Sequence, residues 1–536
     1  MTFFNLNKKQ VLFFLTFFFL IFLFGSSKLP VLDRDEARFA SASKTMIENN
    51  EFVDIRIGDE KRYKKPIGIY WAQITSNYFF GNQPYNKILI YRLPSLLGVI
   101  LSFLIIYLYI SKVFNRQKAF LSIYFLISSL LSISEIHQAK TDGMLFLFVN
   151  ICNLILIELI RNGKVSKFLK LVFWTCLGVG VLIKGPIIFI FVVIPLLVFS
   201  VITKKNLLKE IYSTFGVLLF LIISVPWFVL ISIKSGGTFW NESLINDLLR
   251  KIGTGQESHG FPPGYYSILI FIFFWPGSIF LISYLVTLKK NWKVFVKRNY
   301  TNIFLLLWFF IPFLIFELIS TKLPHYVFPS YTAISILIAC HIFDKNFIDI
   351  KYFTLPLILF PTIFCAGFIY ALYEFSSVDL NAILIFLVFL IFTIFLLLLA
   401  RKEQIKSLII STGLFQFLVY LTLTNFLVDR LEPLWISKKI SQIIEIEKSS
   451  TDEILNFGFN EPSLFFLTSH SSKMISPSNY QTSDFIDKKI IYIVTDEYSE
   501  IFEYDSKFYS FRLESEFRGF NYSRGKKLNL KVYKNY

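Results

Sequence analysis

Thirteen apolar stretches, joined by short connections, constrain the fold of this chain more than any other feature of its sequence. Most of them approach the ~20 residues that a helix needs to cross ~30 Å of hydrocarbon. The stretches are residues 11–25, 88–111, 118–134, 143–160, 169–183, 185–203, 211–233, 265–288, 301–320, 325–343, 352–373, 381–400 and 406–428. The sequence therefore predicts an α-helical polytopic membrane protein with about 13 transmembrane helices.

Lysines and arginines cluster in every second connection and are sparse in the others. The clusters are Lys8/Lys9, Lys112/Arg116/Lys118, Arg161/Lys164/Lys167/Lys170, Lys204/Lys205/Lys209, Lys289/Lys290/Lys293/Lys297/Arg298, Lys345/Lys351 and Arg401/Lys402/Lys406. Because positively charged connections stay in the cytoplasm, we expect the N-terminus there and the tail from Val428 onward on the outer face. The net charge of +17 then reflects topology and contact with anionic membrane lipid, so nucleic-acid binding is not expected.

Composition excludes a soluble enzyme, since 54% of the residues are hydrophobic and 18% are aromatic. The four cysteines all fall in apolar stretches and show no metal-binding or disulfide spacing. The first stretch also resembles a secretory signal, but no clear cleavage site follows Gly25-Ser26-Ser27. We therefore expect it to be a retained anchor.

We expect two domains. Residues 1–428 form the membrane domain, which includes long outer loops at 26–87 and 234–264. Residues 429–536 contain short apolar runs, such as 454–459, 490–494 and 528–533, and these predict a small α/β domain on the outer face. No internal repeat is visible, which argues against an inverted-repeat transporter.

The first outer loop predicts a helix on the membrane surface that starts near Asp33 and stops at Asn49-Asn50. Asp33 fits an N-cap, and Glu36 fits the reciprocal position of a capping box. Asp35 is not needed for the cap. A carboxylate held at this depth suits a general base, so Asp35 is the preferred candidate.

Two lysines precede a second helix signal in the same loop, Lys64-Lys65-Pro66. Pro66 fits the first helical position. The ammonium groups and free backbone N–H groups would then point at one place, where a phosphate could bind. A solvated pair facing lipid headgroups explains the residues equally well.

Three further sets of polar residues lie in short outer connections. Asp142 follows the turn 135–141, where it either serves a site or caps the next helix. Lys184 is the sole charge between two apolar stretches, and it indicates either an anionic partner or a snorkelling side chain. Glu317 and residues 321–326, with Lys322, His325 and Tyr326, either line a polar cavity or cap helices.

The loop 234–264 contains glycines that make a lid over a site plausible. Its polar residues are Glu242, Asp247, Arg250, Lys251 and His259, and we expect most of them to be structural. No P-loop, Rossmann fingerprint, zinc motif or serine elbow is present in the chain.

Five short motifs together form a recognisable series: Asp35-Glu36, Lys65-Pro66, Asp142, Lys184-Gly185-Pro186 and Lys322–Tyr326. In this order and topology they resemble the polyprenyl-phosphate-sugar-dependent glycosyltransferases of the GT-C superfamily. The closer likeness is to the bacterial branch that contains the lipid A aminoarabinose transferase and relatives of protein O-mannosyltransferases (glycosyltransferase families 39 and 83).

The resemblance implies roles for several residues. Asp35 would be the catalytic acid residue, Asp142 a second acid of the site, Lys65 a phosphate contact and Lys184 a donor-binding cation. The remaining substrate-binding candidates are Tyr326, His325, Lys322, Glu36 and Arg38. No cofactor is implied. A divalent metal is doubtful because Lys64 stands where the aminoarabinose transferase has Glu, although His259 is a possible metal ligand.

The resemblance also implies an inverting glycosyltransferase in the bacterial inner membrane, with its C-terminus in the periplasm. It would move a sugar from a polyprenyl (undecaprenyl) phosphate carrier to a hydroxyl or phosphate of an acceptor. Lipid A or another envelope glycolipid is the first choice of acceptor, and protein is the alternative. A transporter or flippase of lipid-linked sugars and a non-catalytic membrane scaffold are the rival functions.

Overall fold

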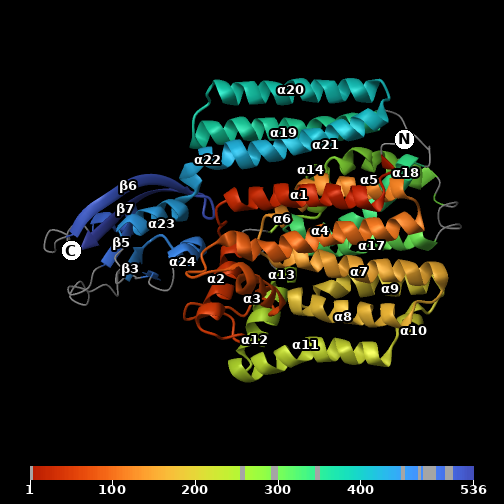
Figure 1. Ribbon diagram of the computed structural model, residues 1–536, viewed down its shortest axis with the longest axis horizontal. Coiled ribbons are helices and arrows are strands. Elements are labelled where there is room, and N and C mark those ends of the chain that lie inside the picture. Colours follow the sequence, from red (N-terminus) through yellow and green to blue (C-terminus); the bar gives the residue numbers. More distant parts are fainter. Residues whose placement is uncertain are drawn as a thin grey trace.

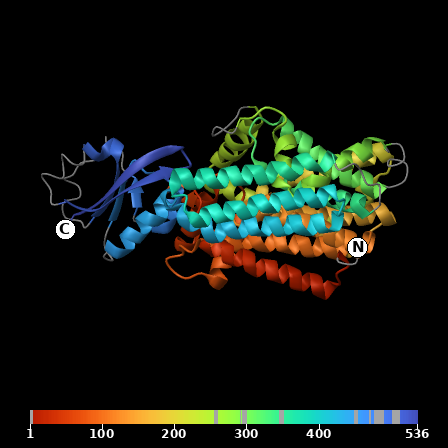
Figure 2. The same cartoon turned by 90° about the horizontal axis from the view of Figure 1, so that it is seen from above.

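A computed structural model describes residues 4–253, 260–290, 292, 300–343, 351–447, 453–468, 472–474, 490–500 and 511–535. The chain folds into a bundle of long helices with a small sheet domain at one end (Figure 1). The N-terminus lies at the opposite end of the bundle, and a view turned by 90° agrees with this placement (Figure 2). The expected helical membrane protein with a C-terminal α/β domain is confirmed.

The long helices of the bundle are α1 (Lys8–Lys28), α4 (Ile88–Val113), α5 (Arg116–Ser128), α6 (Leu130–Ile136), α7 (Thr141–Asn162), α8 (Lys167–Lys184), α9 (Ile187–Thr203), α11 (Thr214–Ser235), α14 (Tyr265–Phe273), α15 (Leu281–Lys290), α17 (Tyr300–Leu318), α18 (Tyr331–Phe343), α19 (Lys351–Phe375), α20 (Leu380–Arg401) and α21 (Ile405–Thr422). Shorter helices join them: α2 (Asp35–Glu48), α3 (Gly68–Phe80), α10 (Leu207–Ile211), α12 (Thr238–Trp240), the π-helix η2 (Asn241–Leu249), α13 (Arg250–Gly253), η3 (Gly277–Phe280), η4 (Pro324–Ser330), η5 (Leu423–Leu427), α22 (Val428–Arg430) and η6 (Glu432–Leu434).

Each of the 13 expected stretches falls on helix. Within the described chain, nine helices are long and apolar enough to span a membrane, or up to 11 if each of two bent pairs counts as one span. The bent pairs are α5 with α6 and α14 with the segment Gly277–Lys290. The other two stretches correspond to α8, which carries three lysines, and α9, which has only 17 residues.

The spans differ in how deeply they lie within the bundle. α20 exposes most of its apolar surface, as a helix that faces lipid does. α7 and the span of η4 and α18 are the most buried of the candidate spans in the described chain. Their N-terminal ends lie at the end of the bundle that carries the sheet domain, so the two best-enclosed helices both begin there (Figure 1).

Glycines bring α4 and α7 into close backbone contact. A Cβ atom built on Gly98 would lie 2.6 Å from the carbonyl oxygen of Gly143, and one built on Gly143 would lie 2.7 Å from the carbonyl oxygen of Ser95. Small residues allow membrane helices to approach in this way. The register between α4 and α7 is therefore set by backbone contact directly beside Asp142.

The C-terminal sheet has the strand order β4-β3-β5-β7-β6. Its strands are β3 (Glu453–Phe457), β4 (Ser472–Met474), β5 (Ile490–Thr495), β6 (Phe511–Asn521) and β7 (Lys526–Asn535). β3 runs parallel to β4 and β5, whereas β7 is antiparallel to β5 and β6. The strands expected at 454–459, 490–494 and 528–533 are confirmed as β3, β5 and β7, and β6 was missed. The boundary expected between 428 and 429 stays a prediction.

The domain also contains α23 (Ile436–Glu447) and α24 (Pro462–Thr468), and α24 packs against α2. Phe466 joins Val31, Ala37, Ala40 and Tyr91 in one buried cluster. The helix expected from near Asp33 to Asn49-Asn50 is confirmed as α2, and it is enclosed between α3 and α24, while its place at the membrane surface stays a prediction.

The capping box expected from Asp33 and Glu36 is wrong. α2 begins at Asp35, and its N-cap is Arg34, which provides no side-chain cap. Glu36 instead accepts hydrogen bonds from the guanidinium of Arg92 at 2.7 and 2.8 Å and from the backbone N–H of Leu32 and Ala139. The physical reason is that a fully buried guanidinium requires a carboxylate partner. In the same loop α3 begins at Gly68, so Pro66 precedes the helix and does not open it.

Arg92 fixes the loop that leads from α1 to α2. Its remaining N–H groups donate to the carbonyl oxygens of Ser26, Leu29 and Pro30 at 2.7 to 2.8 Å. Its side chain is 0% exposed and that of Glu36 is 1% exposed, so this ion pair is shielded from solvent. One residue of α4 thus determines where α2 starts.

Replacing Arg92 by Met should lower the free energy of unfolding by ~3–5 kcal/mol, because Glu36 would remain buried without its counter-charge. The measurement is thermal unfolding in detergent. Lys234→Ala is the matched control, since Lys234 pairs with Glu51 at a partly exposed site and should matter by less than ~1 kcal/mol. Equal losses in the two variants would contradict the prediction.

Candidate functional site

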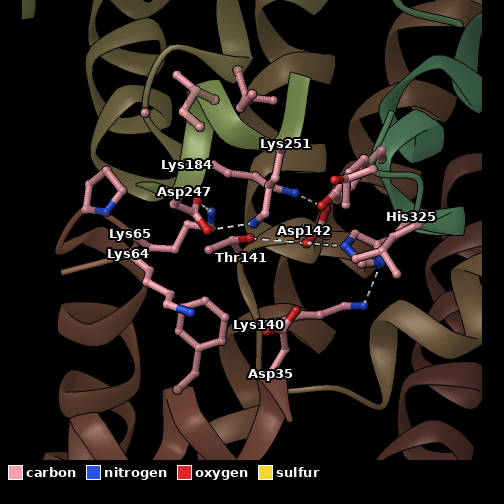
Figure 3. A pocket seen from close by; sticks show the side chains of 18 of the residues that line it. Asp35, Lys64, Lys65, Lys140, Thr141, Asp142, Lys184, Asp247, Lys251 and His325 are labelled. Carbon is pink, nitrogen blue, oxygen red and sulfur yellow. Dashed lines mark hydrogen bonds and ion pairs between the residues drawn. The ribbon is translucent and has the colours of Figure 1, made fainter. Parts of the chain in front are cut away.

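A cavity of about 870 Å³ lies at the end of the bundle that carries the sheet domain. This is the size of a site for a substantial small molecule. Its lining contains eight lysines and arginines: Arg34, Arg38, Arg62, Lys64, Lys65, Lys140, Lys184 and Lys251. It also contains six acids: Asp33, Asp35, Glu36, Glu135, Asp142 and Asp247. Figure 3 shows how the central members face one another.

The cavity has an apolar wall as well as a charged part. Ile187, Ile190 and Ile194 lie on one face of α9 and line the cavity at successive depths. This face extends about 10 Å along the helix. Val181, Phe273, Phe316 and Ile319 add to the same lining. An amphipathic molecule with an anionic head and an apolar chain would match both parts.

Most residues that the sequence singles out come together here. Asp35, Arg38, Lys65, Asp142, Lys184, His325 and Tyr326 all line the cavity. Glu36 also lines the cavity, and its carboxylate oxygens accept hydrogen bonds from Arg92 and from two backbone N–H groups, so its expected role in substrate binding stays a prediction. His259 lies outside the described residues.

The sequence left two alternatives open for Glu317 and residues 321–326, which were helix capping and the lining of a polar cavity. The structure shows some of these residues in each role. Glu317 accepts hydrogen bonds from the backbone N–H groups of Gly264 and Ser267 at the start of α14, so it caps that helix. The Lys322 ammonium donates to the carbonyl oxygens of Phe261 and Ile319 at 2.8 and 2.5 Å. Lys322 is not among the described residues that line the cavity, and its expected role in substrate binding stays a prediction. His325 and Tyr326 belong to the cavity.

Asp142 and Lys184 form an ion pair at the start of α7 and the end of α8. The Lys184 Nζ lies 2.6 Å from the Asp142 Oδ1, and both side chains are more than 90% buried. Lys184 also lies 5.3 Å above the Tyr326 ring, where a cation is attracted to the aromatic face. The anionic partner expected for Lys184 is therefore, in this structure, Asp142.

Glu135 and Lys140 extend this charge network. The Lys140 Nζ lies 2.9 Å from the Glu135 Oε1 and 3.3 Å from the His325 Nδ1. The His325 Nε2 is 3.9 Å from the Asp142 Oδ2, so the imidazole of His325 lies between Lys140 and Asp142 (Figure 3). Sequence reasoning singled out Asp142 alone. The available signal was the spacing of Glu135, Lys140 and Asp142 within one short connection.

Lys65 and Lys251 share the carboxylate of Asp247. The Lys65 ammonium donates to the Asp247 Oδ2, and the Lys251 Nζ lies 2.7 Å from the Asp247 Oδ1. Burial would raise the pKa of Asp247, but the two ammonium groups lower it below its usual range. Burial lowers the pKa of Lys65 to about 8, against the opposing effect of Asp247. Asp247 and Lys251 of the loop 234–264 thus line the cavity, although the sequence did not single them out as site residues.

Asp35 differs from the other acids that line the cavity because, in the described part of the chain, its carboxylate has neither an ion pair nor a hydrogen bond, whereas Asp33 accepts a hydrogen bond from the backbone N–H of Ser463. Figure 3 shows Asp35 on the side of the cavity near Lys140, with no marked interaction. Burial would raise its pKa, but the fields of Arg62, His325, Lys140 and Lys65 lower it. The site therefore holds one ionised carboxylate that is free to accept a proton.

No group of three or more His, Cys, Asp and Glu side chains in the described parts of the chain is placed to hold a metal ion.

Comparison with known proteins supports the family resemblance. A family model described as dolichyl-phosphate-mannose-protein mannosyltransferase matches residues 64–230. An undecaprenyl phosphate-alpha-4-amino-4-deoxy-L-arabinose arabinosyl transferase from Proteus mirabilis is 28% identical over 331 residues, which are 60% of this chain and 57% of the relative. The corresponding transferase from Wigglesworthia glossinidia brevipalpis is 27% identical over 62% of this chain and 58% of the relative. Each match covers less than two thirds of the relative's own length.

The similarity in fold to solved structures extends over nearly the whole chain. The crystal structure of ArnT from Cupriavidus metallidurans bound to undecaprenyl phosphate is similar with a TM-score of 0.74 and 17% identity, covering 99% of both chains. Its apo state is similar with a TM-score of 0.73 over 98% of both chains. The chain therefore has the fold of these ArnT structures, and part of its membrane region is similar in sequence to the arabinosyl transferases and to the mannosyltransferase family model.

Proposed function

We propose that this protein is an inverting glycosyltransferase that moves one sugar from a polyprenyl phosphate to an acceptor at the outer face of a bacterial inner membrane. One observation carries the proposal: a single cavity combines an unpaired carboxylate, Asp35, with buried ammonium groups and an apolar wall. The names of the relatives point the same way, since they are transferases that use an undecaprenyl phosphate-linked sugar.

The donor occupies both parts of the cavity. Its polyprenyl chain lies along the isoleucine face of α9, and its phosphate lies between Lys65 and Lys184. Both ammonium groups already neutralise carboxylates, so the phosphate replaces or joins Asp247 and Asp142 as their partner. As the sugar leaves, negative charge grows on the phosphate, and these cations stabilise it in the transition state.

The acceptor approaches from the side of Asp35. If it is a hydroxyl, its oxygen attacks the anomeric carbon while the bond from that carbon to the phosphate oxygen breaks. The bonding electron pair leaves with the phosphate, and the acceptor proton passes to Asp35. Asp35 is ionised at neutral pH, so it can accept the proton without prior titration. If the acceptor is an ionised phosphate, Asp35 has a positional role.

The acceptor is lipid A or another envelope glycolipid. A protein hydroxyl is the second candidate, favoured by the mannosyltransferase family model that matches residues 64–230. The alternation of basic connections places the N-terminus in the cytoplasm and the cavity with the sheet domain in the periplasm. A transporter of lipid-linked sugars would use the same amphipathic cavity but would leave the bond between sugar and phosphate intact.

The deciding experiment measures release of free polyprenyl phosphate from a panel of polyprenyl-phosphate sugars by purified protein, with an envelope-lipid extract as acceptor. Asp35→Asn should lower turnover by ~10²- to 10⁴-fold, as expected for loss of a general base. Asp59→Asn, an exposed acid of the same loop, is the control and should behave as wild type. Binding without release across the panel would favour transport, and normal turnover by Asp35→Asn would refute the role of Asp35.

The pH dependence should identify Lys65 as a phosphate ligand. Lys65 loses its charge as the pH rises through about 8, so kcat/KM for the donor should fall above that pH by up to ~10-fold per pH unit. Lys65→Arg should move this decline above pH ~10, because a guanidinium stays protonated. Lys61→Arg, on an exposed strand outside the cavity, is the control. A decline that stays near pH 8 in Lys65→Arg would assign it to another group.

A further inference from the structure

The turn between β6 and β7 touches the two residues that precede Asp35. The backbone N–H of Asp33 donates to the Tyr522 Oη at 2.7 Å. The guanidinium of Arg34 donates to the carbonyl oxygen of Ser523. The C-terminal domain therefore holds, nearly 490 positions away in sequence, the segment that carries the unpaired carboxylate.

The turn that makes these contacts is itself held in place. The buried carboxylate of Glu461 accepts hydrogen bonds from the Asn521 Nδ2 at 2.8 Å and from the Ser523 Oγ at 2.7 Å. The Asn521 Oδ1 in turn accepts from the backbone N–H groups of Ser523 and Arg524 at 3.1 and 3.2 Å. Contacts within the C-terminal domain thus fix the position of the turn that carries Tyr522.

Arg34 shows that the loop conformation depends on its surroundings. Its φ of 68° and ψ of −117° belong to a region that residues other than glycine rarely adopt. Such a conformation persists only where neighbouring contacts impose it. The contacts of Asp33 and Arg34 with the β6–β7 turn are contacts of this kind. A third contact joins the Asp33 Oδ1 to the backbone N–H of Ser463 at 3.3 Å.

Asp35 stands between two anchors. On one side Glu36 is bound by Arg92 of the membrane domain, and on the other Asp33 and Arg34 are bound by the C-terminal domain. The Asp35 side chain has no partner of its own among the described residues, so its position follows from its backbone.

We propose that the C-terminal domain is a clamp on the catalytic loop, and that Tyr522 is a positioning residue that acts through Asp35. The inference rests on the proposed function, because it assigns to the domain a part in the same transfer reaction. The docking of α24 on α2 is a separate contact, in which Lys44 donates to the Phe466 carbonyl oxygen at 2.8 Å. Removing the Tyr522 hydroxyl should therefore loosen the loop without detaching the domain.

The test is Tyr522→Phe in the full-length protein, assayed by release of polyprenyl phosphate. The ring stays and only the hydroxyl is lost, so kcat should fall ~10- to 100-fold, as small misplacements of a reacting group do. The KM for the donor and the unfolding temperature should match wild type, because neither the phosphate ligands nor the domain core change. Tyr498→Phe is the matched control, since Tyr498 packs on a different cluster of the same domain.

A double mutant distinguishes positioning from a general structural role. In the Asp35→Asn background, Tyr522→Phe should have little further effect on kcat, because the group it positions is already lost. A wild-type kcat for Tyr522→Phe would overturn the clamp, as would an equal loss in both backgrounds. A wild-type rate for Asp35→Asn alone would overturn the proposed function instead, so the two failures are separable.

Arg34→Gly provides an independent variant if Tyr522→Phe does not fold. Glycine accepts the backbone conformation of residue 34 without strain but removes the bond to Ser523 and frees the loop. The clamp predicts a lower kcat with an unchanged donor KM for this variant too. An unchanged kcat would count against the proposal as directly as the tyrosine result.

Discussion

Charge that is buried next to a bilayer must meet opposite charge, and the arrangement of this site follows from that requirement. Arg92 binds Glu36, Lys184 binds Asp142, Lys140 binds Glu135, and two lysines share Asp247. These pairs join α2, α4, the connection before α7, α8 and the 234–264 loop into one frame. Asp35 has no direct partner among the residues that the structure describes, and the surrounding cations keep it ionised. A reactive carboxylate is thus obtained from an otherwise neutralised network.

The cavity combines a charged environment and an apolar environment in one site. Its charged part lies at the N-terminal ends of α7 and of the span of η4 and α18. These are the two most buried candidate spans of the described chain, so neighbouring helices enclose them. Its apolar part follows α9, which reaches back into the bundle. A lipid-linked phosphate needs both environments at once. In the proposed donor complex, the frame of charged pairs would hold the head of such a molecule and α9 would contact its chain.

The sequence was sufficient for the helices, for the apolar runs of three strands and for most of the charged lining residues, because apolar runs and charges that have no local explanation are visible in one dimension. Asp35 and Lys184 were found in this way. The ion pairs were not predictable, because their members are far apart in sequence. Asp247 and Lys65, for example, are separated by 182 positions and meet only in the folded chain. The partners of Glu36 and Lys322 were not predictable for the same reason, because Arg92 and two backbone carbonyls lie outside any local pattern. The clamp of Tyr522 on Asp33 depends on a contact between domains that no motif records.

The glycine contact between α4 and α7 has a consequence for how such a protein can diversify. Gly98 and Gly143 bring two backbones together with no room for a side chain, so Arg92 on α4 and Asp142 on α7 behave as points on one rigid body. Any substitution that moved one helix would disturb both charged pairs together. The isoleucine face of α9 takes part in neither charged pair. A substitution on the apolar wall can therefore change the shape of the cavity without moving the helices that hold the two charged pairs.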